Sequence, residues 1–180
     1  NTCGLAVRDT VSEAWKDALA GDPVSAFGGI IIFNCAVDLE TARQIDEIFY
    51  SVLIAPEYNK DALEHLKKKK KRIILRLKST EGPRMNSKTV LNGTLVQEYD
   101  QRSVKKEDLS VATKKKPSEQ EIRDMIFANK VVKHLKSNAI ALVKNEQLLG
   151  GGNGQTSRVD ALKQAIHKAK SFDFNLDGAI

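Results

Sequence analysis

The chain has 180 residues, a length that fits one domain or two small lobes and allows a substantial hydrophobic core. Hydrophobic residues make up 41% and charged residues 29%, as in ordinary soluble globular proteins, and no apolar run is long enough to cross a membrane. The net charge of +6 comes largely from lysine runs at 67–72 and 114–116, but no aromatic residue lies among these lysines, which argues against a nucleic-acid partner.

Predicted helices alternate with short predicted strands over the first half of the chain. Apolar residues at helical spacing, with Asp9 or Thr10 as the first N-cap, predict helices over 9–19, 38–49 and 60–69. Apolar runs bounded by glycine, proline or polar residues predict strands over 30–33, 52–56 and 73–77, the first of them buried. The lysine run at 67–72 then lies at a helix end, where lysines complement the helix dipole.

The segment 78–116 is more polar than the sequence on either side of it. It contains Gly-Pro and Asn-Gly pairs, which are typical of turns, and one short strand is predicted near 94–96. We interpret 78–116 as a lid or connector between a first lobe, 1–77, and a continuation of the core, 117–180.

The last part of the chain begins with the strongest helix pattern, because Ser118 and Glu121 have the spacing of a capping box. The predicted apolar face of this helix contains Ile122, Met125, Ile126 and Val131. Strands are predicted over 139–143 and 147–149, followed by a glycine loop and a final helix over 157–170. The residues of that helix expected to point inward are Val159, Leu162, Ala165 and Ile166. This alternation predicts an α/β sandwich.

The sequence GGGNGQTSR at 150–158 is either a phosphate-binding loop or only a turn. It lacks the Lys-Ser/Thr pair of a Walker loop and the glycine spacing of a dinucleotide fingerprint. Arg158 at the predicted helix start favours the phosphate hypothesis, since a guanidinium can bind phosphate in bidentate fashion.

Other candidate residues also have two interpretations. Asn138 either caps a turn or presents an amide to a substrate. Phe27 is either a core ring or part of a pocket, while Gly28 could let a ligand approach the backbone. Cys3 and Cys35 are too few for a disulfide framework and have no metal-ligand spacing, so we interpret them as reduced thiols.

Several segments together resemble one family, the AICAR transformylase domain of the bifunctional purine biosynthesis enzyme that also carries IMP cyclohydrolase. These segments are DPVSAFGGIIIFN, LIAPEY, KKKKRIILRL, TLVQEYD, KPSEQEIRDMIFANKVVKHLKSNAIALVKN and GGGNGQTSRVDAL, in family order. The resemblance implies a cytidine-deaminase-like layered α/β sandwich with a mixed sheet and no zinc. It also implies a cytoplasmic homodimer with sites near the subunit interface. The reaction would pass a formyl group from 10-formyltetrahydrofolate, the folate co-substrate, to the 5-amino group of AICAR.

The resemblance also implies roles for five residues. Asn138 would hold the amine and carboxamide region of AICAR, and Arg158 would bind the nucleotide. Phe27 and Gly28 would line the base pocket, and Val159 would lie near the folate. The amine is a weak nucleophile, so its orientation and the removal of its proton would supply much of the rate.

The chain departs from the family pattern in three places. Lys-His-x-Asn-Pro-Cys-Gly appears only from its Asn, as Asn1-Thr2-Cys3-Gly4, and Ser51 replaces an acidic residue. The chain also stops before the family's Ser-Asp-Ala-Phe-Phe-Pro-Phe folate loop. We therefore expect a fragment of the transformylase. The alternative is a non-catalytic nucleotide-binding or dimerisation domain of the same fold.

Overall fold

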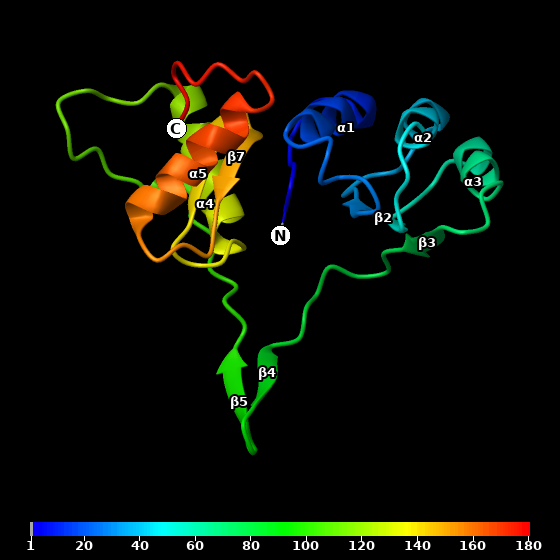
Figure 1. Cartoon of the computed structure of the whole chain (residues 1–180), viewed down its shortest axis with the longest axis horizontal. Helices are drawn as coiled ribbons and strands as arrows, with labels where there is room; N and C mark the ends of the chain where they lie inside the picture. The colour runs from blue at the N-terminus through cyan, green and yellow to red at the C-terminus, as the bar shows by residue number, and fades with distance from the viewer. Residues whose placement is uncertain (1) are drawn as a thin grey trace.

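The computed structural model describes residues 2–180, and Figure 1 shows two groups of helices and strands with a protruding hairpin between them. The helices are α1 (Val11–Ala20), α2 (Leu39–Ile45), α3 (Lys60–Leu66), α4 (Glu119–Lys133) and α5 (Arg158–Lys170). The strands are β1 (Ile30–Ile32), β2 (Val52–Ala55), β3 (Ile73–Arg76), β4 (Met85–Val90), β5 (Gly93–Glu98), β6 (Ile140–Lys144) and β7 (Gln147–Gly152). None of the helices in this described part is long and apolar enough to cross a membrane.

The first lobe is a parallel sheet, in the order β1-β2-β3, with α1, α2 and α3 packed on one side of it (Figure 1). Its core contains Trp15 of α1, together with Leu53 of β2 and Leu66 of α3. The predicted helices and strands are confirmed, although α2 and α3 end earlier than expected. Of the two predicted N-caps of α1, Asp9 and Thr10, the structure has Thr10.

The other face of this sheet is uncovered. Ile30 and Ile32 of β1 are 69% and 62% exposed, and Ile73 and Leu75 of β3 are also exposed. The prediction of a buried first strand is therefore wrong for this face. The physical reason is that side chains alternate along a strand, and only Ile31 of β1 reaches the helix-covered core.

The second lobe contains the antiparallel pair β6–β7, against which α4 and α5 pack. Ser118 and Glu121 form the predicted capping box, and Val131 is buried as expected. Phe127 and Asp124 are also buried, and each lies one residue from a predicted position, Ile126 and Met125, which are only half-buried. The Asp124 carboxylate accepts backbone N–H groups from the β6–β7 turn, which explains why a charged side chain is buried there.

The prediction for the inward-facing residues of α5 is confirmed for Ala165 and wrong for Val159 and Leu162. Ala161, Ala165 and Ala169 are fully buried against β7, whereas Val159 is 59% exposed and Leu162 is also exposed. The prediction places the larger apolar residues on the inward face of the helix. This contact instead requires small residues, because it leaves no room for Val or Leu.

The segment 78–116 contains the β4–β5 hairpin, and this hairpin projects away from both lobes (Figure 1). The short strand predicted near 94–96 is part of β5, but β4 was not predicted. The β4 sequence, MNSKTV, reads as polar, and both hairpin strands are exposed along their whole length.

Several contacts join the lobes. The extended segment before α1 pairs with β7, where Leu148 N–H donates to Leu5 C=O at 2.9 Å. The buried Asp22 forms an ion pair with Lys168 of α5.

Parallel and antiparallel strand pairs occur in separate sheets within residues 2–180, and the expected single mixed sheet is not present among them.

The lysine run at 67–72 is partly structural. Arg72 and Lys69 both bind Asp46, at the end of α2, and the Arg72 guanidinium also lies 4.0 Å from the centre of the Tyr50 ring. Burial alone raises the pKa of Asp46, but the hydrogen bonds from Arg72 and Lys69 outweigh it and hold that pKa below its ordinary value. Asp46 thus joins α2, the end of α3 and the start of β3.

We expect Asp46→Asn to lower the free energy of unfolding by about 3 kcal/mol at pH 7, because the nearly buried Arg72 loses its charged partner. Since the pKa of Asp46 is lowered by folding, this difference is present above about pH 4 and shrinks as the pH falls below it. Urea unfolding at several pH values measures it. The control is Lys68→Glu, at an exposed lysine that forms no ion pair within residues 2–180, and it should cost under about 0.5 kcal/mol. Equal losses in both variants would contradict this role for Asp46.

Candidate functional site

Asn138 lies between α4 and β6 and fixes the loop that precedes α5. Its side-chain Nδ2 donates to the carbonyl oxygens of Gln155 at 3.1 Å and Thr156 at 3.2 Å. Its backbone N–H also donates to Gln155 C=O at 3.1 Å, and the peptide bond between Ser137 and Asn138 is cis. Both side-chain donors are thus used within the protein. Among residues 2–180 no donor is assigned to the Asn138 Oδ1, which leaves that oxygen able to accept a hydrogen bond.

The three glycines at 150–152 belong to a strand and not to a loop. β7 continues through Gly152, and a Cβ on Gly152 would lie 1.9 Å from the Ala161 carbonyl oxygen. A Cβ on Gly150 would lie 2.3 Å from the Ala165 carbonyl oxygen. These glycines therefore let α5 pack directly against the β7 backbone. The hypothesis of a phosphate cradle is wrong for 150–152, and only 153–157 form a connection between strand and helix.

Arg158 is the first residue of α5 and is exposed. Ser157 caps the helix, since its hydroxyl oxygen accepts the Asp160 N–H at 3.0 Å. Arg158 therefore lies at the N-terminal end of α5, where the helix dipole is positive. Both the dipole and the guanidinium charge favour binding of an anion there. Val159 follows it on the exposed surface.

Phe27 and Gly28 form an exposed corner directly before β1. The Phe27 side chain is 70% exposed, and its ring centre lies 5.6 Å from that of Phe49, so the core-ring interpretation of Phe27 is wrong. Gly28 has a φ of +77°, a conformation that favours glycine, and its N–H donates to Phe49 C=O at 2.8 Å.

The five predicted residues fall into two groups. Phe27 and Gly28 lie in the first lobe, and Asn138, Arg158 and Val159 lie in the second. Within the described residues no hydrogen bond, ion pair or aromatic contact joins one group to the other. Sequence reasoning did not find the structural roles of Gln155 and Thr156, whose carbonyl oxygens hold Asn138, because nothing in a single sequence marks a carbonyl acceptor.

The first residue of the motif at the chain start, Asn1, lies outside the described residues. Gly4 of the same motif packs tightly on α1, because a Cβ there would lie 1.8 Å from the Ala18 carbonyl oxygen. Cys3 and Cys35 are both exposed free cysteines. Over residues 2–180 no group of three or more His, Cys, Asp or Glu residues could hold a metal ion.

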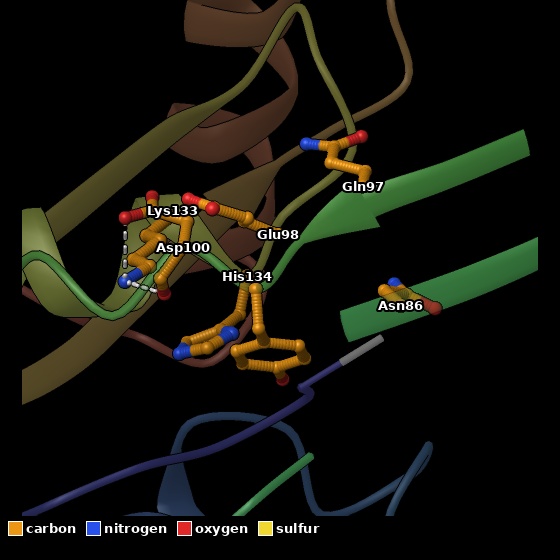
Figure 2. A pocket seen from close by; sticks show the side chains of 7 residues that line it. Asn86, Gln97, Glu98, Asp100, Lys133 and His134 are labelled. Carbon is orange, nitrogen blue, oxygen red and sulfur yellow. Dashed lines mark hydrogen bonds and ion pairs between the residues drawn. The ribbon is translucent and has the colours of Figure 1, made fainter. Parts of the chain in front are cut away.

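A shallow hollow of about 210 Å³ lies elsewhere, between the base of the β4–β5 hairpin and the end of α4 (Figure 2). Figure 2 shows Lys133 bonded to Asp100, with His134 beside it and Asn86 across from them on β4. None of the five predicted residues lines this hollow. These five residues therefore lie on surfaces outside this hollow.

Comparison with known proteins identifies the family of the chain. A sequence model described as "AICARFT/IMPCHase bienzyme" matches residues 1–168, so the chain belongs to this family. The chain is also 57% identical over 180 residues to the bifunctional purine biosynthesis protein PurH of Bacteroides thetaiotaomicron, covering all of this chain and 36% of that protein. The PurH proteins of Persephonella marina and Aquifex aeolicus are 42% and 47% identical over all of this chain, which covers 35% of each. The chain thus spans about a third of the length of these relatives.

The contact between β7 and α5 gives a sharp test of the role of the glycines. We expect Gly152→Ala to lower the free energy of unfolding by about 3 kcal/mol, at the upper end of overpacking costs, because backbone and not a flexible side chain blocks the new methyl group. Thermal unfolding measures this loss. The control is Gly82→Ala, where a Cβ would meet no atom within 4 Å, and it should change stability by under about 0.5 kcal/mol. A neutral Gly152→Ala variant would show that the close contact is not required.

Proposed function

We propose that the chain forms part of an AICAR formyltransferase within a longer, bifunctional enzyme of purine biosynthesis. The enzyme transfers the formyl group of 10-formyltetrahydrofolate to the 5-amino group of AICAR in the cytoplasm, on the way to IMP, and its other activity is IMP cyclohydrolase. The observation that carries this proposal is the family match over residues 1–168, which includes all five candidate residues.

Asn138 is proposed to orient the reacting amine. Its Nδ2 is already bonded to the loop before α5, so Oδ1 is the atom left to accept an N–H of AICAR. An acceptor placed there would align the nitrogen lone pair with the formyl carbon and restrict rotation of the amine. Removal of the amine proton needs a base, and we assign it to the Lys-His pair of the family motif, which would fall just before Asn1.

The other candidates bind the two substrates in this proposal. Arg158 binds the AICAR phosphate, supported by its position at the start of α5. The exposed ring of Phe27 packs on the base, and Gly28 lets the base approach the backbone. Val159, exposed next to Arg158, contacts the folate.

The proposed assembly is a homodimer with its sites near the interface. The separation of the candidate residues into two groups supports it, because neither lobe presents the whole set on its own surface. No nucleic acid is proposed as a partner. The engagement of Lys69 and Arg72 with Asp46 supports this, since two cations of the longest basic run serve the fold.

A second candidate function is a non-catalytic domain of the same fold that binds a nucleotide or mediates dimerisation. This second function is supported by the length of the chain, which covers only about a third of its relatives. The two functions differ in turnover by the longer protein: only the enzyme releases tetrahydrofolate when AICAR is present.

We expect Arg158→Lys in the longer protein to weaken AICAR binding about 10-fold, because lysine cannot supply the bidentate fork of a guanidinium. The folate Kd should change less than about 2-fold. Calorimetric titration of each ligand measures both constants. The control is Lys163→Arg, further along the exposed part of α5, which should leave both constants unchanged. Equal weakening of both ligands by Arg158→Lys would mean that this residue is structural.

The isolated 180-residue chain should show no measurable formyl transfer, although it binds AICAR weakly. A positioned base typically contributes about 10²–10⁴-fold, and the base assigned above is not among its residues. The assay is tetrahydrofolate release, with the longer protein as positive control. Turnover by the isolated chain at a rate near that of the longer protein would contradict the assignment of the base.

A further inference from the structure

Ser51 lies where the three parallel strands begin, directly before β2. Its backbone N–H donates to Gly29 C=O, and its own C=O accepts the Ile73 N–H, both at 2.9 Å. These backbone bonds connect the entry of β1 to the entry of β3. Any residue could make them, so they do not by themselves explain a serine.

The Ser51 side chain makes a different contact. Its Oγ donates to the Gly28 carbonyl oxygen at 2.7 Å, a good distance for a hydroxyl hydrogen bond. The Gly28 N–H is bonded to Phe49 C=O on the other side, so both backbone polar groups of Gly28 are held. The peptide groups on either side of its left-handed conformation, φ +77°, are thereby fixed.

This corner carries the exposed ring of Phe27. The ring touches Phe49 but has little else around it, since it is 70% exposed. Its direction therefore depends on the backbone that carries it, and the hydroxyl of Ser51 is the side chain that holds this backbone. An unheld corner would sample several conformations, and a ligand that requires one of them would bind more weakly in proportion to its population.

We propose that Ser51 is a positioning residue for the nucleotide half of the site: its hydroxyl holds the Gly28 carbonyl so that Phe27 and Gly28 are preorganised for the AICAR base. This inference rests on the proposed function for the identity of the ligand. Ser51 acts through Gly28 and needs no contact with the substrate. A side chain that only accepts hydrogen bonds, such as an ionised carboxylate, could not replace it here, because a carbonyl oxygen requires a donor.

The experiment compares Ser51→Ala, Ser51→Thr and a control, Ser87→Ala, in the longer protein. Ser87 is an exposed residue of β4 on the hairpin, outside the candidate site. Steady-state kinetics gives KM for AICAR and for 10-formyltetrahydrofolate and kcat. Amide hydrogen exchange of the peptide over 26–29 gives the stability of the corner without any use of activity.

For Ser51→Ala we expect KM for AICAR to rise about 3- to 10-fold, the range that corresponds to one hydrogen bond. The folate KM and kcat should each change less than about 2-fold, and exchange over 26–29 should quicken by a similar 3- to 10-fold. Ser51→Thr keeps the hydroxyl and should restore both values, and Ser87→Ala should change neither.

Three results would overturn the proposal: unchanged exchange in Ser51→Ala, an equal rise in both KM values, or no rescue by threonine. If the parent protein itself transfers no formyl group, the proposed function fails. The exchange data then still decide whether Ser51 holds the corner.

Discussion

The close contact between α5 and β7 is the constraint on which the second lobe depends. Gly150 and Gly152 offer no side chain, and three alanines of α5 lie directly on the strand. This contact fixes the axis of the helix and therefore the position of its first residue, Arg158. The loop that enters the helix is held in turn by the Asn138 amide. Backbone contact, with little side-chain freedom, thus places Asn138 and Arg158, two of the three candidate residues of this lobe.

The first lobe positions its candidate residues through hydrogen bonds at the strand entries. Ser51 and Phe49 bind the Gly28 backbone from two sides, and Asp46 ties the preceding helix to Arg72 at the start of β3. The corner at Phe27 and Gly28 is thus attached to the most regular part of the lobe, the parallel sheet. A site built on such a scaffold needs little reordering when a ligand binds.

Apolar surface is open at two places in the part of the chain that the structure describes. One is the uncovered sheet face around Ile30 and Ile73, and the other is the β4–β5 hairpin with Leu91 fully exposed at its tip. Contiguous exposed apolar surface of this kind is unusual in a monomer. Together with coverage of only about a third of the relatives' length, it fits a chain whose surfaces meet other parts of a larger protein.

The sequence alone determined the order of most helices and strands, because capping residues such as Thr10 and Ser118 and short apolar runs act over a few residues. The sequence also contains the family motifs, which are read directly from the order of its residues. Only the tertiary structure decided that the glycines of β7 serve packing, that alanines form the buried face of α5, and that Phe27 is exposed. These facts depend on which surfaces meet across long separations, as do the carbonyl acceptors of Asn138 and Ser51. Local sequence specifies the pieces, and the contacts between distant pieces specify the site.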